Sequence, residues 1–242
     1  MKENKQLTEW IEESNYIVFF GGAGVSTESG IPDFRSVDGL YNQQYKYPPE
    51  TMLSHSFFMR EPEEFFRFYR NKVLAPDALP NNAHKALASL EKRGKLKAVI
   101  TQNIDGLHQK AGSEEVLELH GSVLRNYCMS CGKSYSGEEV MAKIDAEGVP
   151  YCDDCHKIIK PDVVLYEEGL DQSILSRSVE HIRNADMLII GGTSLVVYPA
   201  AGLIDYYHGK KLVLINRDST SRDSMANLVI HDSIGEVLEA YI

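Results

Sequence analysis

The four cysteines of the chain form two C-x-x-C pairs, Cys128 with Cys131 and Cys152 with Cys155. This spacing predicts a tetrahedral zinc site, because each tight turn brings two thiolates to one point and the intervening segment can bring the pairs together. Four thiolates leave no open coordination position, so we expect the zinc to be structural. The alternatives are two disulfides, which would require export, and a redox-active cysteine pair, which would require one pair and not two.

His120 is the candidate general base. It follows a predicted strand, Leu117-Glu118-Leu119, and imidazole has an unperturbed pKa close to the pH at which most enzymes operate. The alternative for any single histidine is a satisfied core or surface residue. We expect that alternative to hold for His55, His84 and His208, which lie on predicted helices or loops without polar neighbours.

The other polar candidates also follow predicted strands. Residues 101–108 follow the apolar run 97–100, residues 191–194 follow the run 187–190, and Asn216 follows the run 212–215. The carboxyl ends of parallel strands meet at one edge of a sheet, where this fold class binds its ligands. The sequence therefore predicts a cleft lined with hydrogen-bond donors, acceptors and one imidazole.

Alternating helices and buried strands must position these residues. Helical patterns at residues 6–14, 83–93, 172–184 and 200–208 alternate with strands that begin with an apolar run at 16–20. This alternation predicts an α/β fold, a Rossmann-like parallel sheet with helices on both faces. We expect one domain over residues 1–242, with a large lobe of about 1–35, 80–122 and 161–242. A helical insertion at about 36–79 and a zinc ribbon at about 123–160, with a helix at 137–147, should form a smaller lobe.

A glycine turn, Gly22-Ala23-Gly24, follows the first strand. Such a turn lets backbone amides approach a pyrophosphate at the start of a helix. The pattern departs from the dinucleotide fingerprint, since Thr27 occupies the third glycine position and no acidic residue closes a second strand about twenty residues later. A hydride-transferring dehydrogenase is therefore a poor interpretation.

The composition excludes several classes of protein. Of the 242 residues 43% are hydrophobic, which is too many for a disordered chain, and no apolar stretch is long enough to cross a bilayer. With 25 basic and 35 acidic residues the net charge is −10, so direct nucleic-acid binding is not expected. The amino terminus lacks an apolar export signal, so we expect a cytoplasmic protein. Nothing in the sequence implies an oligomer.

Four ordered motifs resemble those of the sirtuins, the NAD-dependent protein-lysine deacylases. The longest is GAGVSTESGIPDFR at residues 22–35; TQNIDGLH at 101–108 and LHG at 119–121 follow, and then come the four cysteines. The segments KPDVVLY at 160–166 and GTSLVVYPA at 192–200 resemble the family's substrate-binding segments. The resemblance covers nearly the whole chain.

The resemblance implies that NAD is consumed as a co-substrate. In this family the acyl-lysine oxygen attacks the ribose carbon that carries nicotinamide, an alkylamidate forms, and a histidine, here His120, deprotonates the ribose so that free lysine and O-acyl-ADP-ribose result. Asn103 and Gln102 would hold the ribose, Ile104 and Asp105 the nicotinamide carboxamide, and Phe34 would shield the sugar. The implied cofactor-binding residues are Ala23, Thr27, Phe34, Arg35, Gln102, Asn103, Ile104, Asp105, His120, Thr193, Ser194, Asn216 and Ser233.

The resemblance also implies that acyl-lysine proteins are the partners. The peptide would add as a strand between residues 163–166 and 192–197, with Val163, Val164, Tyr166 and Val196 as contacts. The family's usual Phe-Gly-Glu is replaced by Tyr166-Glu167-Glu168, and we expect Glu167 to favour basic residues beside the target lysine.

A second departure concerns the acyl group. Lys72 stands where the desuccinylating branch has the arginine of Tyr-x-x-Arg, while Tyr69 is kept. Lysine lacks the bidentate fork that pairs with a carboxylate, so we expect mainly neutral acyl groups to be removed. The alternative interpretation of Tyr69 is a core residue of an amphipathic helix.

Two other functions use the same features. A protein mono-ADP-ribosyltransferase would share the cofactor cleft and would leave ADP-ribose on protein. A zinc-ribbon adaptor or NAD-sensing module without catalysis is the non-enzymatic alternative, and the presence of both Asn103 and His120 argues against it.

Overall fold

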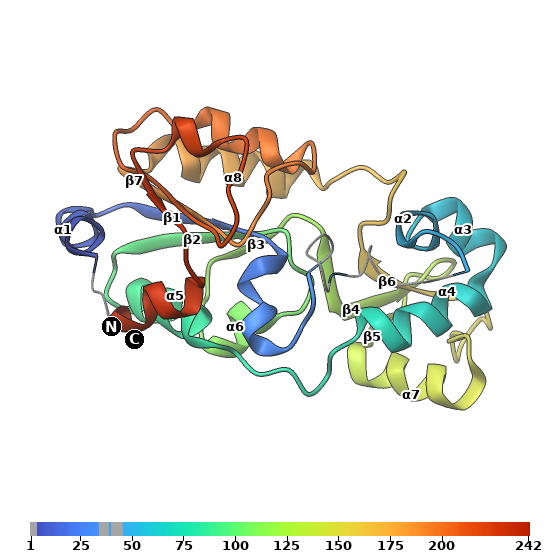
Figure 1. Ribbon diagram of the computed structural model, residues 1–242. Helices are drawn as coiled ribbons and strands as arrows, with labels where there is room; N and C mark the ends of the chain where they lie inside the picture. The colour runs from blue at the N-terminus through green and yellow to red at the C-terminus, as the bar shows by residue number, and fades with distance from the viewer. Residues whose placement is uncertain (1–3, 34–38, 40–45) are drawn as a thin grey trace.

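A six-stranded parallel sheet and the helices that cover it form the larger part of the molecule (Figure 1). The computed structural model describes residues 4–33, 39 and 46–242. The strands lie in the order β3-β2-β1-β7-β8-β9 and all neighbours are parallel. Their bounds are β1 Ile17–Gly21, β2 Leu96–Thr101, β3 Val116–Glu118, β7 Met187–Gly191, β8 Leu212–Ile215 and β9 Leu228–Ile230.

Strand β1 shows why this sheet carries a core on each face. All five of its residues are buried, and successive side chains point to opposite faces. Ile17 and Phe19 join one hydrophobic cluster, which includes residues of helices α1 (Lys5–Glu13), α5 (Asn82–Lys92) and α9 (Ile234–Leu238). Val18 and Phe20 join the other cluster, which includes residues of helix α8 (Gln172–Asn184) and the 3₁₀ segment η5 (Ala200–Tyr206). Figure 1 shows α8 above the sheet and α5 below it.

The three longest helices of this lobe, α1, α5 and α8, begin at side-chain caps. Asn81 and His84 form a capping box at the start of α5, and Asp171 accepts from two backbone amides at the start of α8. The bounds of the elements are α1 Lys5–Glu13, α5 Asn82–Lys92, α6 Leu107–Ala111, α8 Gln172–Asn184 and α9 Ile234–Leu238, with 3₁₀ segments η1 Ala23–Val25, η2 Thr27–Ser29, η5 Ala200–Tyr206, η6 Asp223–Met225 and η7 Glu239–Tyr241.

A second, three-stranded antiparallel sheet lies beside the first, in the order β5-β4-β6. One hydrophobic cluster joins it to the helices that precede α5, with Phe57, Phe58, Phe65 and Phe66 fully buried. The remaining elements are β4 Gly121–Cys128, β5 Ser134–Ser136, β6 Ile159–Val163, α2 Pro49–Met52, α3 His55–Arg60, α4 Pro62–Phe68, the π-helical turn η4 Tyr69–Val73, and α7 Gly137–Glu147.

The predicted Rossmann-like sheet and its helices are confirmed, and α7 has the predicted bounds. Two details differ from the prediction. Strand β9 was not predicted, because its three residues are only partly buried and form the edge of the sheet. The segment from Ala200 is a 3₁₀ helix that ends at Tyr206. In the described part of the chain no helix is long and apolar enough to span a membrane.

Candidate active site

One cleft of about 510 Å³ collects most of the predicted site residues at the carboxyl edge of the large sheet. Fourteen of them line it: Ala23, Thr27, Gln102, Asn103, Ile104, Asp105, His120, Val163, Val164, Tyr166, Thr193, Ser194, Asn216 and Ser233. Phe34 and Arg35 lie outside the described residues. Val196 is half-exposed and does not line the cleft, whereas its neighbour Val197 does.

Two glycine turns pack against each other at the floor of the cleft. The Gly24 amide donates to the Gly192 carbonyl oxygen at 2.8 Å, and Gly192 has a φ of +58°. A Cβ on Gly24 would lie 2.8 Å from the Gly192 Cα, so both positions require glycine. This close approach joins the ends of β1 and β7. Gly22, Gly24 and Gly192 line the cleft, so a ligand could lie directly against their backbone.

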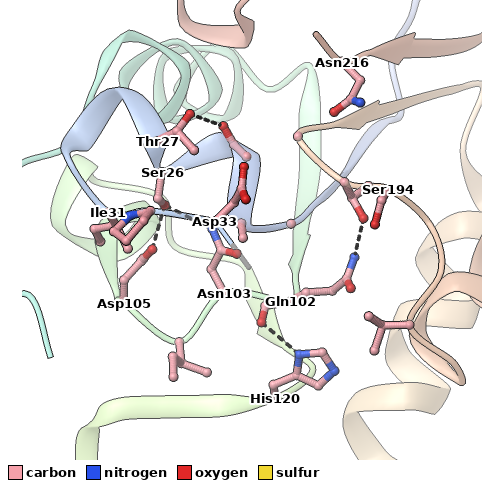
Figure 2. A pocket seen from close by; sticks show the side chains of 18 of the residues that line it. Ser26, Thr27, Ile31, Asp33, Gln102, Asn103, Asp105, His120, Ser194 and Asn216 are labelled. Atoms are coloured by element: carbon pink, nitrogen blue, oxygen red, sulfur yellow. Dashed lines mark hydrogen bonds between the residues drawn. The ribbon is translucent and has the colours of Figure 1, made fainter. Parts of the chain in front are cut away.

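Ser26 connects two of the predicted site residues (Figure 2). Its hydroxyl donates to Asp105 Oδ2 at 2.6 Å and accepts from Asn103 Nδ2 at 3.1 Å. The other Asp105 oxygen accepts from the Leu107 amide at 2.9 Å, which fixes the carboxylate at the start of α6. Ser26 is 1% exposed, so its hydroxyl is a buried support for the side chains of Asn103 and Asp105, which line the cleft.

The His120 ring is fixed by the neighbouring strand end. Nδ1 lies 2.9 Å from the Gln102 carbonyl oxygen, and because a carbonyl can only accept, Nδ1 carries the proton. The neutral Nε2 is therefore the basic nitrogen. Burial lowers the pKa of His120, and the bond to Gln102 opposes that shift in part. The Gln102 side chain itself donates to Thr193 Oγ1 at 3.1 Å, which links β2 to the end of β7.

The segment after β6 runs along the cleft next to His120. The Val164 amide donates to the His120 carbonyl oxygen at 3.0 Å. At the other end of the segment, the Tyr166 amide donates to the Leu53 carbonyl oxygen and the Tyr166 carbonyl oxygen accepts from the His55 amide, both at 3.0 Å. Residues 163–166 are therefore extended backbone that is anchored on both sides.

Glu167 occupies the left-handed region, with a φ of +77°. This conformation is strained for a glutamate. Its carboxylate accepts from the Ser56 amide and the Ser56 hydroxyl, each at 2.9 Å, at the first turn of α3. These two hydrogen bonds explain how a side chain other than glycine is held at this turn. The effect of Glu167 on peptide choice stays a prediction.

The four cysteine sulfurs fit a structural zinc ion. All lie within 4.8 Å of one another, with Cys128 and Cys155 at 3.4 Å and Cys131 and Cys152 at 3.6 Å. Zinc bound tetrahedrally at about 2.3 Å from each sulfur requires sulfurs about 3.8 Å apart. The Tyr135 hydroxyl donates to Cys152 Sγ at 3.2 Å, an outer-shell contact that orients the ligand.

The expectation that His55 and His84 lack polar neighbours is wrong. His55 Nδ1 lies 2.8 Å from Glu168 Oε1, because the turn after the 163–166 segment folds against the start of α3. His84 Nδ1 accepts from the Asn81 amide at 3.3 Å, and its ring packs on His108 at a centroid distance of 4.7 Å. His208 is exposed, as expected.

Several residues that line the cleft were not predicted as site residues. Glu28 accepts from the Gly235 amide at 2.7 Å and ties the first motif to the start of α9. Arg217 lies 3.9 Å from Asp33, and both residues line the cleft. Ser26, Glu28 and Asp33 belong to the 22–35 motif, and membership of that motif could have identified them as site residues. Arg217 directly follows Asn216 and had no signal of its own.

The fold and the cleft define an α/β nucleotide-binding protein with an attached four-cysteine zinc ribbon. A profile of the Sir2 family matches residues 22–199, and the chain belongs to this family. It is 61% identical over 239 residues to the NAD-dependent protein deacetylase of Clostridium acetobutylicum and 62% identical over 240 residues to that of Clostridium perfringens. Each alignment covers 98% of this chain and 97% of the relative.

Solved structures give the same assignment. The structure of Sir2 bound to an acetylated peptide matches with a TM-score of 0.87 at 41% identity, covering 98% of this chain and 95% of the other. Sir2 with a p53 peptide and NAD+ matches with a TM-score of 0.87 at 42% identity over the same shares of the two chains. The second of these two structures contains both a peptide and NAD+.

Proposed function

We propose that the chain removes acetyl groups from protein lysines in an NAD-dependent reaction that yields nicotinamide, O-acetyl-ADP-ribose and free lysine. The observation that carries this proposal is the position of His120 between two halves of one cleft. On one side lie the polar strand ends Gln102, Asn103 and Thr193, and on the other lies the 163–166 segment. The names of the bacterial relatives support the same activity.

The polar half of the cleft fits NAD. The paired glycine turns leave space for a pyrophosphate, and Thr193, Ser194, Asn216 and Ser233 lie at the strand ends where the adenosine would bind. Asn103 and Gln102 would hold the reacting ribose, while Ile104 and Asp105 would take the carboxamide. Bound NAD supplies an electrophilic ribose carbon and a leaving group. Ala23 and Thr27, with Phe34 and Arg35 outside the described residues, complete the proposed set.

His120 would act as general base at Nε2. Its Nδ1–H is held by Gln102, so Nε2 is available to take a proton from a ribose hydroxyl that enters the cleft. The burial that lowers the pKa of His120 keeps the ring neutral, as a base requires. Asn103, positioned through Ser26, would orient the ribose.

The 163–166 segment would bind the acyl-lysine peptide as an added strand, with contacts from the cleft-lining residues Val163, Val164 and Tyr166. Val196 is half-exposed and precedes the cleft-lining Val197, and it would contact the peptide from the 192–197 segment. Tyr69 lines the cleft, is 1% exposed, and its hydroxyl has no hydrogen-bond partner among the described residues. The buried aromatic ring favours a short neutral acyl group. Lys72 also lines the cleft and supplies a point charge at most.

We also propose that the helical insertion and the zinc ribbon act as one small lobe, with the peptide between it and the sheet. The shared hydrophobic cluster of the two insertions supports this division. A cytoplasmic location is proposed because four cysteines that are not in disulfides are typical of a reducing compartment. No direct contact with nucleic acid is proposed for a chain with a net charge of −10.

Mass spectrometry of an acetyl-lysine peptide incubated with the protein, with and without NAD, tests the activity. Deacetylation that requires NAD and is lost in His120→Ala is the expected result. ADP-ribose attached to protein, without deacetylated peptide, would replace the proposal with the transferase reaction. No turnover by the wild-type protein would contradict the proposal.

A further inference from the structure

The 163–166 segment is supported by a buried lysine outside the cleft lining. The Lys160 side chain is 5% exposed, and its ammonium donates to the Val163 carbonyl oxygen at 2.9 Å and to the Pro161 carbonyl oxygen at 3.3 Å. It also lies 3.1 Å from Glu168 Oε2. A buried ammonium has to be paired and hydrogen-bonded, and all three of its donors have partners here.

Glu168 collects three donors from three different parts of the lobe. Oε2 accepts from the Leu165 amide at 2.9 Å and from Lys160, and Oε1 pairs with His55 Nδ1 at 2.8 Å. Burial alone would raise the pKa of Glu168, but the Leu165 amide, His55 and Lys160 together hold it below its usual range. The carboxylate is therefore charged and joins the segment to both β6 and α3.

We propose that Lys160, Glu168 and His55 form a positioning network that holds the backbone of residues 163–166 in the geometry required to pair with an acyl-lysine peptide. The network fixes the Val163 carbonyl oxygen and the Leu165 amide, while His55 also donates its own amide to Tyr166. None of the three side chains reaches His120 or the glycine turns by a described hydrogen bond. The proposal rests on the proposed function, since it assumes that this segment receives the peptide.

Preorganisation of one substrate strand makes a specific kinetic prediction. A strand that is already extended costs less entropy to pair with a peptide, so loosening it weakens peptide binding and leaves the chemical step intact. His55 is the best position to test, because its side chain is 42% exposed and its loss does not leave a large cavity. Asn at this position places an amide nitrogen close to that of Nδ1 and keeps the bond to Glu168.

The experiment measures peptide KM, NAD KM and kcat for wild type, His55→Ala, His55→Asn and Glu168→Gln. Hydrogen exchange of the Leu165 and Tyr166 amides is followed in the same proteins. We expect peptide KM to rise about tenfold in Glu168→Gln, because the glutamine side chain has one accepting oxygen and the glutamate carboxylate has two. In His55→Ala we expect peptide KM to rise about fivefold. NAD KM and kcat at saturating peptide should stay within about twofold of wild type, and His55→Asn should restore peptide KM.

The control is Arg177→Ala, which removes the exposed ion pair of Arg177 with Glu115 on the large lobe and should change none of these values. Unchanged peptide KM in folded Glu168→Gln, or equal rises in the two KM values, would overturn the positioning network. Wild-type protein that does not deacetylate would contradict the proposed function itself, and the positioning network with it. A wild-type protein that deacetylates, together with variants whose peptide KM equals that of wild type, would contradict the positioning network alone.

Discussion

His120 Nδ1 lies 2.9 Å from the Gln102 carbonyl oxygen, and this contact fixes which nitrogen of the ring can act as a base. The protonated Nδ1 donates to the backbone of Gln102, which directly follows β2, and Nε2 is left to accept a proton. A strand end thus sets the tautomer of the catalytic candidate. The arrangement also places the basic nitrogen in the same cleft as Asn103 and Asp105.

The pH dependence of the reaction follows from this environment. Burial lowers the pKa of His120 below the usual 6.5, so the neutral base should persist into mildly acidic solution. We predict that kcat/KM for the acetyl peptide falls on the acid side with a midpoint below pH 6.5, because activity is lost as Nε2 becomes protonated. Initial rates between pH 5 and 8 check this, and a midpoint above pH 7 would contradict it.

Removal of the Ser26 hydroxyl tests the buried support of the cofactor side. Ser26→Ala takes away the donor to Asp105 and the acceptor for Asn103, so both side chains lose their fixed orientation. We predict that kcat/KM for NAD falls about tenfold, as for the loss of one hydrogen bond to a charged group. Ser176→Ala, at an exposed position on α8, is the matched control. Equal values for the two variants would disprove the support role.

Metal removal should unfold the small lobe, and activity should be lost because of that unfolding, since the zinc ion takes no part in the reaction. The ligands Cys128 and Cys152 belong to the hydrophobic cluster that also contains Phe57 and Phe65, so loss of zinc exposes that core. We predict that a chelator abolishes activity together with near-UV circular dichroism, and that added zinc restores both. Full activity in protein shown by metal analysis to be free of zinc would contradict a structural zinc ion.

The buried pair His84 and His108 should make the fold sensitive to acid. Burial lowers the pKa of His84 to about 4 and that of His108 well below 6.5. Above pH 6.5 both states hold neutral rings; below it the unfolded chain binds protons that the folded chain does not, so stability falls with falling pH. From pH 7 to pH 5 His84 alone should cost about 2 kcal/mol.

Urea unfolding at pH 7 and pH 5 measures this loss. His108→Leu should reduce the difference in the free energy of unfolding between pH 7 and pH 5. The substitution removes a buried imidazole whose nitrogens have no hydrogen-bond partner among the described residues. His208→Ala, at an exposed site, should leave the difference unchanged. The idea fails when His108→Leu and wild type lose stability equally.

Acyl preference depends on the residues near Tyr69. We predict that acetyl and propionyl peptides are turned over at least about tenfold faster than a succinyl peptide, because Lys72 lacks the two-pronged contact with a carboxylate. Lys72→Arg should raise succinyl turnover and leave acetyl turnover close to wild type. Competition between labelled peptides measures the ratio directly, and equal turnover of succinyl and acetyl peptides would contradict the prediction.

Much of this site could be predicted because it depends on local patterns. Parallel strands bring their ends together, so the segments after β1, β2, β7 and β8 had to meet at one edge. The cysteine spacing likewise predicted the zinc ribbon. The roles of Ser26 and His55 could not be predicted in this way, because Ser26 contacts Asp105 and His55 contacts Glu168 across 79 and 113 residues of chain.

Quantification of all products of one reaction tests whether the protein consumes NAD to remove the acetyl group. Acetyl peptide and NAD are incubated with wild-type protein and with His120→Ala, and nicotinamide, deacetylated peptide and O-acetyl-ADP-ribose are measured together. We predict equal amounts of the three products from wild type, and neither deacetylated peptide nor O-acetyl-ADP-ribose from His120→Ala. Deacetylated peptide with free acetate and without consumption of NAD would contradict it.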